Sequence, residues 1–201
     1  MLKFERGFTL IELVVTMAVF AILVVVGLPS FSNWIHDEQI RSTAELLQNG
    51  LRGAQAASLN RSRIVVFALT NASPAFEAAP ATNGANWYSQ ALPQFAGEDA
   101  NASYQSSAYI EGGSLNGSGN GTTITGPASI CFNSIGRLVS ETASVGSVTY
   151  NCSAPAAGTP VKYDVANPAG DRPLRVTVSF GGQIRMCDPA RTLSATAPDG
   201  C

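Results

Sequence analysis

One carboxylate near the start of a long apolar segment is the group in this sequence best placed for specific chemistry. Glu12 ends the run Gly7-Phe-Thr-Leu-Ile-Glu12, and no charged residue occurs from Leu13 to Phe31. An acidic side chain inside a membrane helix costs about 2.5–3.5 kcal/mol on insertion scales, so such a residue is usually retained for a function and given a partner. The pattern therefore predicts a specific ionic contact at Glu12.

The segment that must position Glu12 runs from Phe8 to Phe31. As a helix it is long enough to cross a bilayer core of about 30 Å, so we expect a transmembrane helix at residues 8–31. Residues 1–7 are too short for an ordinary secretory leader, which would place small residues after its apolar core. Here the small residue, Gly7, comes before the apolar core.

This arrangement resembles the class III leader of type IV pilins and pseudopilins. In that family the prepilin peptidase cuts after the glycine, which implies that residues 1–7 are a leader removed at the Gly7–Phe8 bond. The resemblance also implies methylation of the new N-terminus on Phe8, and it places Glu12 at the fifth mature position, where the family has its glutamate. The alternative is a simple membrane anchor in which the glycine and the glutamate occur by chance.

Cleavage would give Glu12 a partner. The new amine on Phe8 would be a cation four residues before the carboxylate, and positions i and i+4 share one helix face. The two charges could pair within one chain, or the amine of one subunit could meet Glu12 of its neighbour. Because an unpaired charge in hydrocarbon is strongly penalised, the second contact would fix the axial register of a filament.

Gly27 and Pro29 predict a kink near the membrane exit. Proline removes the hydrogen bond from its own nitrogen to the carbonyl of Val25 and clashes with that turn. In pilins a helix-kinking proline is common at the position that Pro29 would occupy after cleavage. The alternative is an ordinary kink of a membrane helix, which lipid-embedded proteins tolerate.

Residues 32–60 predict an amphipathic continuation of the helix to about Leu59. Apolar residues recur at steps of three and four, which favours one buried stripe packed on a sheet. The stripe consists of Ile40, Ala44, Leu47, Leu51, Ala54 and Ala57. Gly50 and Gly53 oppose the helix by about 1 kcal/mol each relative to alanine. His36, the only histidine, is expected to be a solvated helix residue.

Residues 61–201 are expected to form a β-rich head domain. Segments rich in β-branched and aromatic residues predict strands, and the Gly181-Gly182 pair predicts a hairpin between the last two. The predicted strands are Arg63–Leu69, Trp87–Leu92, Tyr104–Glu111, Ser129–Phe132, Arg137–Ser140, Val145–Tyr150, Val161–Val165, Leu174–Phe180 and Gln183–Cys187. The glycine-rich run 112–121 is expected to be a loop or hairpin tip without core residues.

The predicted fold is therefore one α+β domain, in which a long N-terminal helix packs on an antiparallel head. The order of helix, β-meander and terminal hairpin resembles the branch that contains H-type pseudopilins and FimT/FimU-like minor pilins. In that branch a phrase like residues 130–137 precedes a hairpin like residues 176–187.

All four cysteines follow the apolar segment, which suits an oxidising periplasm. Of the three possible pairings we favour Cys131–Cys152 and Cys187–Cys201, because both close short loops. The second pair resembles the disulfide-bounded C-terminal loop of pilins. A zinc site is the rival interpretation, and we expect no metal because the sequence has no CxxC spacing and its histidine is distant.

The charge is nearly balanced, with 12 basic and 14 acidic residues, and does not indicate nucleic-acid binding by itself. Some FimT-like minor pilins bind DNA through a C-terminal Gly-Arg-x-Arg motif. In this chain the corresponding run, Gly182 to Arg185, has glutamine in place of the first arginine. Arg175, Arg185 and Arg191 are the possible DNA contacts, although exposed arginines on a hairpin are more often solvated.

No enzymatic constellation is visible, because no base lies beside a nucleophile and no glycine-rich phosphate loop is present. We expect no cofactor and no catalytic activity.

The resemblance implies a minor pilin or pseudopilin, a structural subunit of a type IV pilus or a type II secretion pseudopilus, acting in filament initiation or at the tip. Its implied partners are other pilin subunits, the prepilin peptidase and the inner-membrane assembly platform. The alternative is a DNA-binding minor pilin for DNA uptake. The implied location is the inner membrane, with the head in the periplasm, and then the filament.

Overall fold

The structure is a computed structural model that describes residues 7–115 and 121–201, with the backbone alone at residues 26–30. Two predicted features therefore fall partly outside it. Leader residues 1–6 and residues 116–120 of the predicted glycine-rich loop lie outside the described residues. Gly27 and Pro29 fall within a helical backbone whose side chains are not described, so the predicted kink stays a prediction.

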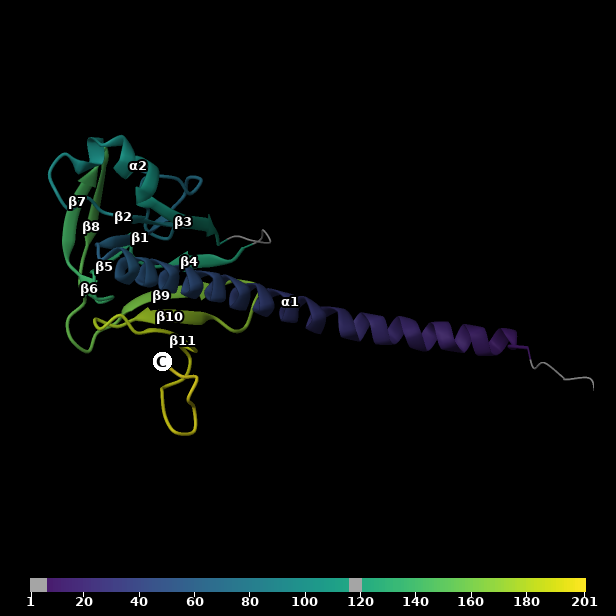
Figure 1. Ribbon diagram of the computed structural model, residues 1–201. Helices are drawn as coiled ribbons and strands as arrows, with labels where there is room; N and C mark the ends of the chain where they lie inside the picture. Colours follow the sequence, from purple (N-terminus) through teal and green to yellow (C-terminus); the bar gives the residue numbers. More distant parts are fainter. Residues whose placement is uncertain (1–6, 116–120) are drawn as a thin grey trace, which may run out of the picture.

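One long helix, α1 (Leu10–Arg61), forms the axis of the molecule, and its N-terminal half projects from the head (Figure 1). The helix ends where Ser62 adopts a left-handed conformation with φ of 51°. The backbone N–H of Ser62 donates to the carbonyl of Leu59, and that of Arg63 donates to Ser58, so two otherwise unpaired carbonyls are satisfied. In the described part of the chain, no helix combines the length and the hydropathy needed to cross a membrane.

The C-terminal half of α1 packs on two antiparallel sheets. The first sheet has the order β3-β2-β1-β5-β6, and the second has the order β11-β10-β9-β4. The strands of the first sheet are β1 (Val65–Thr70), β2 (Asn86–Ala91), β3 (Tyr109–Ser114), β5 (Ser129–Phe132) and β6 (Leu138–Val139). Those of the second are β4 (Thr123–Thr125), β9 (Val161–Ala166), β10 (Leu174–Val178) and β11 (Ile184–Cys187). The predicted α+β architecture is confirmed.

The apolar stripe of α1 forms the centre of the main core, as its spacing predicts. Five of its side chains are completely buried against both sheets. They are Ile40, Ala44, Leu47, Leu51 and Ala54. The sixth predicted member, Ala57, is partly buried at the edge of the same cluster. The helix and the two sheets therefore form one unit around a shared core.

A second core lies on the other face of the first sheet. Strand β1 is buried on both faces, because Phe67 packs toward α1 while Val66 and Ala68 pack away from it. That outer face is covered by the short helix α2 (Ala102–Ala108) and by a separate hairpin, β7 (Glu141–Val145) and β8 (Val148–Cys152). A 3₁₀ turn, η1 (Glu98–Ala100), precedes α2.

Two strand predictions were wrong. Tyr104–Glu111 is not a single strand, because the chain forms α2 before β3 begins. Asn101 starts that helix by accepting a hydrogen bond from the backbone N–H of Ser103 at 2.8 Å. Val145–Tyr150 is also not one strand, because Gly146 adopts φ of +54° and turns β7 into β8.

The glycine-rich run was also predicted incorrectly where it is described. Its first residues, Gly112 to Ser114, extend β3 beside β2. Leu115, in the same run, is completely buried and belongs to the main core. The predicted hairpin at Gly181-Gly182 is present, since β10 pairs with β11 from Val178–Ile184 to Arg175–Cys187.

Candidate functional site

The predicted site residues Gly7, Phe8 and Glu12 lie at the start of α1 or directly before it. Thr9 is the N-cap, and its Oγ1 accepts a hydrogen bond from the backbone N–H of Glu12 at 3.3 Å. This places Glu12 in the first turn, where the positive end of the helix dipole favours a negative charge. Among the described residues, the carboxylate of Glu12 has no hydrogen-bond or ion-pair partner within its own chain.

The predicted cleavage bond lies in an accessible part of the backbone. Gly7 and Phe8 precede the helix in irregular structure, and no atom lies within 4 Å of the position that a side chain on Gly7 would occupy. Phe8 is 81% exposed. Exposed, irregular backbone is what a peptidase needs to accommodate a substrate strand.

The apolar surface of the projecting half of α1 has no cover within the chain. From Phe8 to Val25 its large apolar side chains are exposed, and the head packs only on the later part of the helix (Figure 1). A continuous apolar surface of this kind indicates a membrane or a protein partner, because single soluble chains rarely leave such patches uncovered. The arrangement separates an apolar arm, residues 8–25, from a folded head.

The head is closed by two disulfide bonds. Cys131 on β5 is joined to Cys152 on β8, with Cα atoms 5.6 Å apart, and this bond links the first sheet to the β7–β8 hairpin. Cys187 on β11 is joined to Cys201, with Cα atoms 5.2 Å apart, which returns the chain end to the second sheet. No described cysteine is free.

The three arginines singled out as possible DNA contacts are engaged by acceptors in the head. Arg175 forms a two-point contact with Asp164, at 2.6 and 3.2 Å. Arg185 donates to the carbonyls of Pro198 and Gly200, both at 2.8 Å. Arg191 lies 2.9 Å from Asp199 and 3.5 Å from Asp188. A phosphate would have to compete with these contacts, and the acidic partners would repel it.

Residues 2–28 match the family model of the prokaryotic N-terminal methylation motif. The chain carries this methylation motif. The match includes Gly7, Phe8 and Glu12, which are the residues that the structure places at the exposed start of α1.

Two solved structures resemble the fold of most of the chain. Both are crystal structures of the type IV minor pilin FimU of Pseudomonas aeruginosa (strain PAO1), in space groups P65 and P21. The first is 15% identical, covers 80% of this chain and 98% of its own, and has a TM-score of 0.46. The second is 14% identical, covers 84% of this chain and 98% of its own, and has a TM-score of 0.49. A comparison with curated protein sequences found no match.

Thr9 is a residue of the methylation motif that the sequence reasoning missed. Its spacing to Glu12, Thr-x-x-Glu, is the signature of a helix capping box and could have identified the first residue of the helix. The cap has a consequence for Glu12, because it fixes the turn that carries the carboxylate. Asn33 and Asp37 were also missed as contacts of the head, and no local sequence signal marks them.

Proposed function

We propose that this chain is a minor pilin, a non-catalytic structural subunit of a type IV pilus or of a type II secretion pseudopilus. The observation that carries the proposal is the methylation motif at the exposed start of a helix that continues without interruption into a folded head. Such a chain joins a processing site, an apolar assembly surface and a presented domain on one continuous helix. Its proposed place is the start or the tip of the filament.

In this function the apolar arm is anchored in the inner membrane before assembly. The head lies in the periplasm, where an oxidising environment maintains both disulfide bonds. The prepilin peptidase removes residues 1–7, and the inner-membrane assembly platform moves the processed subunit into the filament. There, arms of other pilin subunits replace lipid as the cover of the apolar surface.

Glu12 sets the register in this scheme. Its carboxylate has no partner within the described part of its own chain, so the methylated amine on Phe8 of a neighbouring subunit is the partner we assign. A misplaced subunit would leave both charges unpaired in an apolar environment, and that penalty selects a single axial position.

Replacing Glu12 tests this assignment. We expect Glu12→Ala to be inserted and processed normally but to reach sheared filaments at less than about a tenth of the wild-type level. The variant leaves the amine on Phe8 of the neighbouring subunit unpaired, and an unpaired buried charge costs more than about 1.4 kcal/mol. Immunoblots of membrane and filament fractions measure incorporation, and N-terminal mass spectrometry measures processing. Glu45→Ala is the matched control, because Glu45 lies on the same helix and forms only an exposed ion pair with Arg41.

Two results would contradict the proposal. Normal incorporation of Glu12→Ala would exclude the register role, and a wild-type chain without a methylated Phe8 would exclude the pilin assignment itself.

A separate experiment distinguishes the two filament systems. A deletion strain is scored for surface pili and for secreted enzymes, and the one that is lost identifies the system.

DNA uptake is the alternative function, and it is not favoured. Arg175, Arg185 and Arg191 already bind carboxylates or backbone carbonyls of the head. The observations therefore support a structural role more directly than a nucleic-acid interface.

A further inference from the structure

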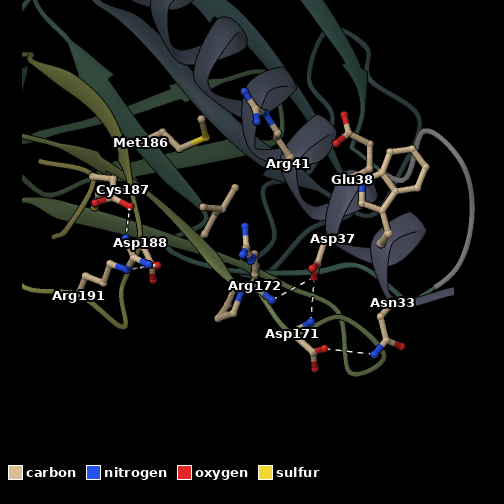
Figure 2. Close-up of a pocket in the computed structure, with 14 residues that line it drawn as sticks. Asn33, Asp37, Glu38, Arg41, Asp171, Arg172, Met186, Cys187, Asp188 and Arg191 are labelled. Atoms are coloured by element: carbon tan, nitrogen blue, oxygen red, sulfur yellow. Dashed lines mark hydrogen bonds and ion pairs between the residues drawn. The ribbon is translucent and has the colours of Figure 1, made fainter. Parts of the chain in front are cut away.

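A cleft opens where α1 leaves the head. It has a volume of about 810 Å³ and lies between one face of α1, the loop that joins β9 to β10, and the C-terminal loop after β11 (Figure 2). Met186 and Leu174 contribute apolar lining, and both are half-buried. The cleft is therefore a mixed polar and apolar site next to the apolar arm.

The wall of this cleft is held in place by α1. The Oδ1 atom of Asp37 accepts hydrogen bonds from the backbone N–H groups of Asp171 and Arg172, at 2.8 and 3.1 Å. Asn33 adds a hydrogen bond from its side-chain amide to the carboxylate of Asp171 at 3.2 Å. Figure 2 shows these contacts joining the helix to the loop. Because the loop is fixed before any ligand arrives, the cleft is preformed.

Most charged groups around the cleft already have a hydrogen-bond or ion-pair partner. On its far wall, Arg191 contacts both Asp188 and Asp199. Arg41 is paired with Glu45, and the nearby charge of Glu38 adds to the rise of its pKa. Within the described part of the chain, the carboxylate of Glu38 and the guanidinium of Arg172 have no hydrogen bond or ion pair. These two groups leave the cleft with one acceptor and one donor of opposite charge.

The overall charge of the lining selects among ligands. Five carboxylates and three guanidinium groups line the cleft, so a ligand with only negative charge is disfavoured. A zwitterion with a phosphate and an ammonium group suits it better. Arginine is well adapted to phosphate, and an ammonium group donates well to a carboxylate.

The position of Trp34 indicates where such a ligand comes from. Trp34 lines the cleft and is 60% exposed, and its ring centroid lies 5.7 Å from that of Phe31, which is 59% exposed. Exposed aromatic residues at the end of an apolar helix are typical of the membrane–water interface. The cleft thus lies at the level of lipid headgroups if the arm is in a membrane.

The geometry points to a binding site for the headgroup of a phosphoethanolamine lipid. Arg172 binds the phosphate, Glu38 accepts from the ammonium group, and Trp34 packs against the start of the acyl chains, which then follow the arm past Phe31. This inference rests on the proposed function, because it requires the arm to be inserted in the membrane.

Lipid retention by the full-length chain tests the site. The chain is placed in nanodiscs of phosphatidylcholine containing equal small fractions of phosphatidylethanolamine and phosphatidylglycerol, and native mass spectrometry identifies the lipids that stay bound on release. We expect phosphatidylethanolamine to be enriched about fivefold over the other two, the range of one or two exposed charged contacts. Arg172→Gln should lower retention of every phospholipid, whereas Glu38→Gln should remove only the preference for phosphatidylethanolamine.

The controls are Lys162→Gln and Glu141→Gln, which remove one charge of each sign outside the cleft and should retain the full enrichment. Three results would overturn the site. They are retention of lipids in proportion to the bulk, a preference for phosphatidylglycerol, and an enrichment of phosphatidylethanolamine that is unchanged in both cleft variants. Flotation of the same samples separates this failure from a failure of the proposed function. A chain that does not float with vesicles has no membrane arm, whereas one that floats without lipid preference lacks only the headgroup site.

Discussion

Tyr88 and Tyr150 place two hydroxyl groups in the second core, where each can remain only if it is hydrogen-bonded. Their oxygens lie 3.0 Å apart, and Tyr88 also donates to the carbonyl of Ala78. Burial is the main cause that raises the pKa of Tyr150 to about 12, and it raises the pKa of Tyr88 further above the ordinary value of 10. Both side chains are therefore held neutral in the folded protein.

Stability should consequently fall in alkali. Below pH 10, Tyr150 is neutral in both the folded and the unfolded chain, so its contribution to the free energy of unfolding is fully present. As the pH rises from 10 toward 12, only the unfolded chain ionises at Tyr150, and this contribution is lost. We expect Tyr150→Phe to lower the free energy of unfolding by about 1 kcal/mol at pH 7. The difference from wild type should shrink between pH 10 and pH 12. Urea unfolding at pH 7, 9, 10.5 and 11.5 measures this, and a constant difference would contradict the assignment.

At the residue scale, the sequence predicted what is local. Gly7, Phe8 and Glu12 lie within six consecutive residues, so the motif could be recognised from the sequence alone. The role of Asp37 could not, because its partners Asp171 and Arg172 follow more than a hundred residues later and are joined to it only by the tertiary fold. The same holds for Arg185, whose acceptors depend on the path of the C-terminal loop.

At the scale of the element, Gly50 and Gly53 lie where α1 meets the first sheet. A Cβ atom on Gly50 would lie 2.8 Å from the ring of Trp87, which is itself stacked on Phe67. A Cβ atom on Gly53 would instead meet the end of the exposed Glu111 side chain. The sequence showed only the cost of glycine in a helix, whereas the packing shows its reason at Gly50.

These two positions give a matched prediction. Gly50→Ala should destabilise the head by about 1–3 kcal/mol, because overpacking against a fixed indole outweighs the helix preference of alanine. Gly53→Ala should be neutral or stabilising by up to about 1 kcal/mol, because a flexible carboxylate can move aside. Chemical unfolding of both variants in detergent measures the pair. Equal effects at the two sites would show that helix propensity alone determines the outcome.

Element prediction failed where short polar segments were decided by capping and turns. The serine-rich run at Ala102–Ala108 has weak helix propensity, yet Asn101 caps it and Tyr104 buries its ring in the second core. Tyr104 also donates to the carbonyl of Ala91 at 2.7 Å. Strands with strong alternation and a clear turn, such as β10 and β11, were predicted well, because their pairing is local.

At the scale of the whole molecule, the two disulfide bonds act on different parts of the chain. Cys131 and Cys152 are nearly completely buried, and their bond joins two sheets across the second core. Cys201 is exposed, and its bond to Cys187 closes a surface loop that is also held by Arg185 and Arg191. One bond therefore belongs to the core and the other to a peripheral loop.

Removing each bond should separate these roles. In a chain-entropy model each loop contributes about 3 kcal/mol, but Cys131→Ala with Cys152→Ala should cost more, because it also leaves a cavity between two packed sheets. Cys187→Ser with Cys201→Ser should leave most of the head intact and expose the segment after Asp188 to proteases, because Arg185 and Arg191 hold it only at the surface. Unfolding in detergent and limited proteolysis with mass spectrometry measure the two effects. A C-terminal loop that stays protected from proteases without its disulfide would show that the arginine contacts alone fix it. Equal losses of global stability in the two double variants would show that this loop is part of the cooperative core.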